Sequence, residues 1–192
     1  YVIAENAGRE AIGLDPGDIW ATHAIAHVLE MQGRRTEGLS LLQSHEQHWN
    51  GGNNLLHHLW WHQALFHMER REFDEVLTLY DLRFRNHASP LTLQMPDLYI
   101  DVQNAVSMLW RLERHGIDIG ERWNELADKA ETRSGDCSNP FTLPHDVLAL
   151  ARTQRFNAAR KYIGNMKDFV AEGSSSLVRP VRDAALPVCE AI

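Results

Sequence analysis

Apolar residues recur at spacings of three and four along most of this chain, which is the period of one face of an α-helix. No run alternates with the two-residue period of a β-strand for long enough to form one. Clusters of glycine, proline and asparagine interrupt the helical pattern at intervals. The sequence therefore predicts an all-α fold built from short helices joined by turns.

The interruptions divide the chain into helices that can pair as hairpins. Asp18 is expected to cap a helix start through its side-chain oxygen, and Gly33 to permit the turn after that helix. Residues 86–96 are expected to form a loop, longer than a helical hairpin needs, that shapes the mouth of a site. The first predicted helix contains Ala4, Ala7 and Ala11. The later ones cover residues 19–32, 36–49, 55–70, 73–84, 97–114, 120–132, 143–153, 157–172 and a last segment from 177.

A turn followed by an aromatic residue opens two of the second helices, in the segments RREFDEV and TQRFNAA. Aligning these signatures makes Gly33, Arg71 and Gln154 equivalent, and Gly116 joins them if the third pair carries an insertion. The intervals are about 38, 45 and 38 residues, against about 34 for a tetratricopeptide repeat. We therefore expect an α-α superhelix of degenerate tetratricopeptide-like hairpins, with a closed helical bundle as the alternative.

Length and charge restrict the classes of function. The 192 residues are expected to form a single domain, residues 1–192, and the start at Tyr1 rather than Met predicts a fragment of a longer protein. The net charge of -7 without a basic stripe argues against nucleic acid and anionic lipid as partners.

Cys137 and Cys189 form no CxxC motif, and no apolar run is long enough for a membrane span. A cytoplasmic location is expected.

Three segments resemble the tetratricopeptide repeat protein 38 family: HAIAHVLEMQGRRTEG from His23, HHLWWHQALFHMERREFDEVLTLYD from His57, and DVQNAVSMLWRLERHG from Asp101. The resemblance covers most of residues 1–130, and the WWH run within a helix is its most specific element. It implies an α-α superhelical repeat fold in a family without a settled biochemical activity. It supplies a fold and no mechanism.

Two of the predicted inner helices carry histidines four residues apart. His23, His27 and Glu30 lie within about 60° of one another around the first helix. His58 and His62 lie about 40° apart on the second helix. Since neighbouring helices pack about 8–10 Å apart, these side chains are expected to meet on the concave wall.

Other polar and aromatic groups are expected beside this cluster. Asp97, Asp101 and Asn104 of the third inner helix are in a position to complete it. Trp60 and Trp61 point about 100° apart, so one can pack between helices while the other faces the groove. The predicted groove residues are His23, His27, Glu30, His58, Trp61, His62, Asp101 and Asn104.

Two functions are compatible with these residues. The first is a scaffold whose His- and Trp-lined groove binds a protein segment or small molecule without a cofactor. The second is a metal-dependent enzyme or metal-binding protein using His23, His27, His58 and His62, since imidazoles at i and i+4 suit Zn or Fe. Simple packing of histidines between helices also fits the pattern. The sequence has no HExxH, GxSxG or phosphate-loop motif, so catalytic residues stay unassigned, as does the oligomeric state.

Overall fold

A computed structural model of the protein describes residues 1–96 and 98–192. Those residues form helices and turns and contain no strand, which confirms the all-α prediction. The chain divides into two compact units, residues 1–104 and 105–192, with the division inside helix α7 (Tyr99–Arg114). The arrangement of the hairpins into a superhelix remains a prediction. Within the described residues, no helix combines the length and apolar character that crossing a membrane requires.

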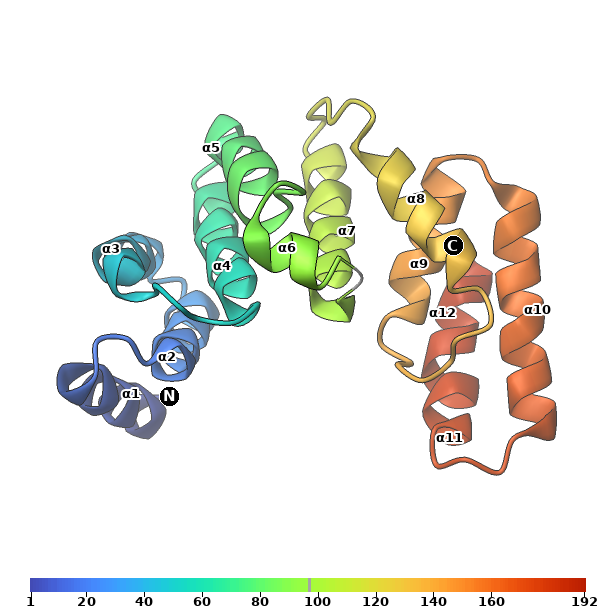
Figure 1. The fold of residues 1–192 in the computed structure, drawn as a ribbon, viewed down its shortest axis with the longest axis horizontal. Helices are drawn as coiled ribbons and strands as arrows, with labels where there is room; N and C mark the ends of the chain where they lie inside the picture. Colours follow the sequence, from blue (N-terminus) through green and yellow to red (C-terminus); the bar gives the residue numbers. More distant parts are fainter. Residues whose placement is uncertain (97) are drawn as a thin grey trace. The chain divides into compact units, whose positions relative to one another are not determined.

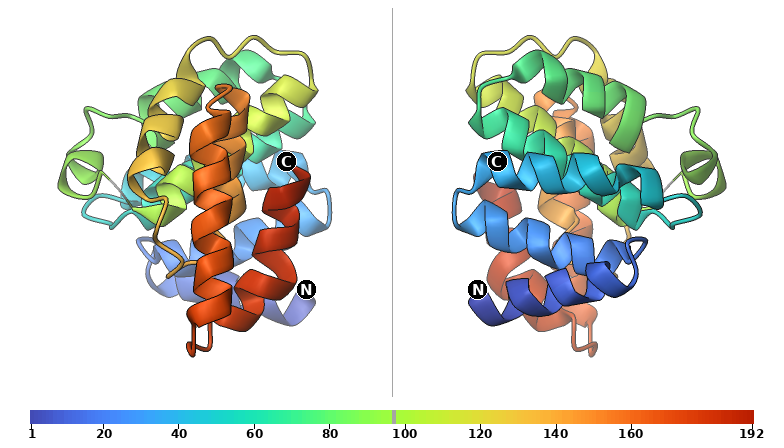
Figure 2. Two further views of the ribbon diagram at one scale, coloured as in Figure 1. Left: turned by 90° about the vertical axis from the view of Figure 1, so that its right-hand side faces the viewer. Right: turned by 90° about the vertical axis from the view of Figure 1, so that its left-hand side faces the viewer.

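In the first unit, each helix from α1 to α5 packs against the next one along the chain (Figure 1). The helices α1, α2 and α3 lie as successive layers (Figure 2, right), and α2 also packs against α4. The elements of this unit before α7 are α1 (Val2–Leu14), α2 (Ile19–Met31), α3 (Arg35–His45), η1 (Glu46–His48), α4 (Leu55–Glu69), α5 (Phe73–Leu79), η2 (Tyr80–Phe84) and α6 (Pro90–Gln94).

The predicted cap of α2 is present. Asp18 Oδ1 accepts hydrogen bonds from the backbone nitrogens of Trp20 at 3.0 Å and Ala21 at 2.9 Å. The side chain thereby satisfies donors that the first turn of a helix leaves without intrahelical partners. This cap fixes where α2 begins, one turn before His23.

The four turns predicted to be equivalent share one backbone geometry. Gly33, Arg71, Gly116 and Gln154 all have positive φ, between 59° and 75°. In each turn the next residue donates its backbone N–H to a carbonyl five positions earlier, as in the bond from Arg34 to Leu29. This is the Schellman closure, which satisfies the carbonyls at a helix C-terminus. The alignment of these four positions thus corresponds to a shared conformation.

The predicted loop over residues 86–96 is wrong in part, because α6 (Pro90–Gln94) forms inside it. Ser89 caps this helix by accepting from the backbone nitrogen of Thr92 at 3.1 Å. Pro90 occupies the first helical position, where its fixed φ suits a helix and its missing N–H is not needed. The Ser-Pro pair therefore starts a short helix in a segment without a helical apolar stripe.

The apolar core of the first unit lies between α2, α3 and α4. Ile25, Leu29, Leu42, Leu59 and Phe66 are fully buried in it. Gly38 on α3 is required here, because a Cβ at this position would lie 2.2 Å from Cζ of Phe66. The close approach of α3 to the Phe66 ring brings α3 against the side of α4.

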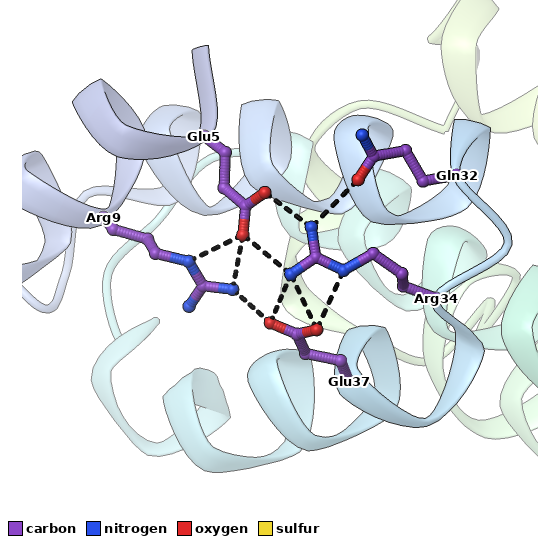
Figure 3. A network of polar contacts seen from close by, with 5 residues as sticks. All are labelled: Glu5, Arg9, Gln32, Arg34 and Glu37. Carbon is purple, nitrogen blue, oxygen red and sulfur yellow. Dashed lines mark hydrogen bonds and ion pairs between the residues drawn. The ribbon is translucent and has the colours of Figure 1, made fainter. Parts of the chain in front are cut away.

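A network of charged side chains joins α1 to the start of α3 (Figure 3). Arg34 Nη1 bonds to Glu5 Oε2 at 2.6 Å, and Arg9 Nη2 bonds to Glu37 Oε1 at 2.5 Å. The hydrogen bonds from Arg34 and then Arg9 lower the pKa of Glu5 to about 2. The network ties α1 to the turn between α2 and α3.

In the second unit α10 runs beside both α9 and the C-terminal α12 (Figure 2, left). Leu126, Leu143, Leu150 and Met166 are buried in its core. Apart from the end of α7, its elements are α8 (Arg122–Thr132), α9 (Leu143–Arg152), α10 (Phe156–Glu172), α11 (Val178–Pro180), η3 (Val181–Ala185) and α12 (Leu186–Ala191).

Candidate metal centre

Two histidine pairs from neighbouring helices converge in the first unit. His23 and His27 lie on α2, and His58 and His62 lie on α4, which packs against α2. Each pair has i,i+4 spacing, so both of its rings stand on one helix face. The ring centroids of His23 and His58 are 4.9 Å apart, and those of His27 and His62 are 4.4 Å apart. The structure thus brings together four of the residues that the sequence predicted for the groove.

Four nitrogen atoms of this cluster, one from each ring, lie within 4.8 Å of one another. Nε2 of His23 and Nε2 of His27 lie 3.0 Å apart, within hydrogen-bond distance. Around a tetrahedral zinc ion with Zn–N bonds of about 2.0–2.1 Å, the ligand nitrogens stand about 3.4 Å apart. The 3.0 Å distance and the 4.8 Å limit of the cluster bracket that spacing.

Two of the four rings are oriented through their Nδ1 atoms. His62 Nδ1 donates to Oε2 of Glu30 at 2.9 Å, and His58 Nδ1 donates to Oδ1 of Asn104 at 3.1 Å. A ring that donates from Nδ1 keeps its lone pair on Nε2. Nε2 of His62 is buried and has no hydrogen-bond partner. A histidine that ligates a metal through one ring nitrogen commonly donates a hydrogen bond from the other, as Nδ1 of His62 and His58 do here.

The protonation of the cluster also favours metal binding. Burial, followed by the charges of His62, His58 and His27, lowers the pKa of His23 to about 3. Burial lowers the pKa of His58, against the effect of its bond to Asn104, and lowers the pKa of His62 well below its ordinary value. These rings are therefore neutral at pH 7, so no proton competes for their lone pairs.

Two tryptophans flank the cluster. The ring of Trp61 stacks on His58, with centroids 5.1 Å apart and planes 11° apart. Trp20 meets His23 edge-on at 6.1 Å and is 62% exposed. Trp61 is partly buried, so it both supports His58 and borders the site.

Asp101 lies in a neighbouring network rather than in contact with the four rings. It is 2% exposed, and its Oδ2 accepts from Nδ1 of His57 at 2.9 Å and from Nδ2 of Asn54 at 3.2 Å. Asn104, one turn further along α7, contacts His58 instead. Asp97 lies outside the described residues. The first turns of α7 therefore hold two consecutive histidines of α4.

Neither the contact of His57 with Asp101 nor the pairing of Glu30 with His62 was predicted from the sequence. His57 is 1% exposed and faces away from the cluster, since it lies next to His58 and about 100° around the helix. Glu30 was expected on the stripe of His23 and His27, and its bond instead crosses to the other helix. Both contacts join helices that are distant in sequence, so the sequence alone gives no signal for them.

No protein-family model matches this chain, and no solved structure matches it significantly. The resemblance to the tetratricopeptide repeat protein 38 family therefore stays a prediction. The geometry of the histidine cluster is therefore the basis for a proposed function.

Proposed function

We propose that this protein binds one divalent transition-metal ion through His23, His27, His58 and His62. The observation that carries the proposal is the convergence of four imidazole nitrogens within 4.8 Å. A buried Nε2 without a partner, on His62, costs about 1–3 kcal/mol of stability, and coordination would remove that cost. Packing alone would not call for four histidines at one place on two helices.

The donor set favours borderline metals. Imidazole suits zinc, iron, copper and nickel, whereas magnesium and calcium take oxygen ligands. The cluster contributes four imidazoles and no carboxylate. We propose zinc as the resident ion, with ferrous iron as the alternative.

A groove that binds a peptide or small molecule without metal is the second candidate. Trp20, exposed beside His23, is the observation in its favour. Against it, His62, Asp101 and Asn104 are at most 4% exposed, so they offer little surface to a ligand in an open groove. Burial of His62, and of Asn104 behind His58, is what a metal site needs, whereas an open groove would leave these side chains exposed.

Elemental analysis of protein purified without an affinity tag or chelator tests the proposal. We expect about one metal ion for each chain in the unchanged protein. The double variant His27→Ala/His58→Ala should lose the metal and keep its helical circular-dichroism spectrum. His48→Ala is the matched control, because His48 is exposed and lies outside the cluster.

Two results would overturn the metal proposal. One is protein that contains no metal after growth in zinc- and iron-supplemented medium and takes up neither Zn²⁺ nor Co²⁺ in solution. The other is metal that persists in the double variant, which would locate it elsewhere in the chain.

A further inference from the structure

We infer that the bound metal accepts the carboxylate group of a small ligand as a fifth ligand, and that the apolar part of this ligand lies against Trp20. This inference rests on the proposed metal site. It concerns what the ion does once bound, and so it can fail while metal binding stands.

Four imidazoles complete a tetrahedral shell, so a carboxylate would be a fifth ligand, a coordination number to which zinc can expand. Both histidine pairs come from α2 and α4, which pack side by side, so the four nitrogens approach from those two helices. Exposure within the cluster is uneven. His62 is fully buried, His23 and His58 are half-buried, and His27 is exposed. An ion among these rings would therefore be reached from solvent past His27.

The charge of the site favours an anion at that position. Four neutral imidazoles leave a divalent ion with its full charge of +2, unlike thiolate or carboxylate ligands. Glu30, on the far nitrogen of His62, offsets part of that charge from outside the ligand set. A monodentate carboxylate would bring the site close to neutrality, and it is an oxygen ligand that zinc and iron accept.

Aromatic rings give the position an apolar border. Four rings follow one another in a row. The centroid of Trp20 lies 6.1 Å from that of His23, His23 lies 4.9 Å from His58, and His58 lies 5.1 Å from Trp61. Trp61 is stacked and partly buried, whereas Trp20 stands at the end of the row with 62% of its surface exposed. A large indole left exposed beside a metal ligand offers a flat surface for the apolar part of a bound molecule.

Visible spectroscopy of the Co²⁺-substituted protein tests this inference, because cobalt absorption reports coordination number and ligand type. We expect acetate to change the spectrum in a saturable way, and 3-phenylpropionate to bind about tenfold more tightly through its ring. Trp20→Ala should remove the preference for 3-phenylpropionate and leave the acetate titration unchanged. Trp110→Ala, which changes a partly exposed tryptophan of the second unit, is the matched control.

The outcomes separate the two proposals. Failure to bind cobalt would overturn the proposed function. Cobalt that binds with a spectrum insensitive to both carboxylates would show a closed site, whether filled by four histidines alone or by Glu30 as well, and would overturn this inference only. Equal affinity for acetate and 3-phenylpropionate, or a preference that survives in Trp20→Ala, would overturn the role of Trp20.

Discussion

His62 on α4 donates its Nδ1 hydrogen to Glu30 on α2 across 2.9 Å, so the bond that orients one histidine also joins the two helices. Changing such a partner of a ligand lowers metal affinity by roughly 10–100-fold. We expect this loss in Glu30→Ala. Glu30→Gln should lose less, because its amide oxygen still accepts from the ring. Competition titration against a chromophoric chelator measures both affinities, and equal affinity in Glu30→Ala and the unchanged protein would contradict the assigned role.

Gly38→Ala is expected to destabilise the protein although alanine favours helices. The added Cβ would overlap the buried Phe66 ring, and overpacking of this kind costs about 1–3 kcal/mol. Alanine recovers only about 1 kcal/mol through helix propensity. Gly164→Ala on α10 is the control, because nothing lies within 4 Å of its added Cβ, and it should raise stability. Urea unfolding measures both changes, and a stabilising Gly38→Ala would rule out the tight packing.

Arg71→Gly and Gln154→Gly are expected to raise the free energy of unfolding by about 0.5–1 kcal/mol each. Both residues have left-handed φ, 62° and 59°, where a Cβ costs about 1–2 kcal/mol and glycine costs little. Arg70→Gly should instead destabilise, since Arg70 has right-handed φ of -85°. Thermal unfolding measures all three variants. A shift of stability in the same direction for Arg71→Gly and Arg70→Gly would contradict the left-handed backbone conformation of Arg71.

Asp146 is expected to make the protein less stable as pH rises. Burial raises its pKa to about 6, against the lowering effect of the hydrogen bond from Tyr162. Because the native pKa exceeds the ordinary value of 3.8, the folded chain holds this proton more tightly than the unfolded chain does. Stability is therefore full below about pH 4 and falls through pH 6, by up to about 3 kcal/mol.

The substitution Asp146→Asn isolates this effect. The amide does not titrate in this range, so the difference in unfolding free energy between the two proteins should grow in favour of the variant from pH 4 to pH 7. Urea unfolding at a series of pH values measures the difference. A pH-independent difference would mean that Asp146 is charged in the folded protein throughout this range.

Local chemistry made much of the fold predictable. Asp18 and Gly33 determine a start and a turn through their own conformational preferences, and the spacing of four places His23 beside His27 without knowledge of other helices. The helix α6 escaped prediction because it is short and is started by Ser89 and Pro90 rather than by an apolar stripe.

Contacts between helices were less predictable. Asp101 was expected beside the histidine cluster, yet it pairs with His57, one residue before the cluster histidine His58. A shift of one residue turns a side chain by about 100°, so the choice between His57 and His58 depends on how α7 rotates against α4. The division into two units at Asn104 likewise has no marker in the sequence, since it falls within a continuous helix.

The shared closures give a common origin from which to count residues. His27 and His23 lie 6 and 10 residues before Gly33, whereas His62 and His58 lie 9 and 13 before Arg71. The two pairs are thus displaced by 3 residues, about 4.5 Å of helix, although their rings meet. The positions 9 and 13 residues before Gly116 hold Ser107 and Gln103. The same positions before Gln154 hold His145 and Phe141. The turn recurs along the chain, but the histidine cluster depends on one axial offset, between α2 and α4.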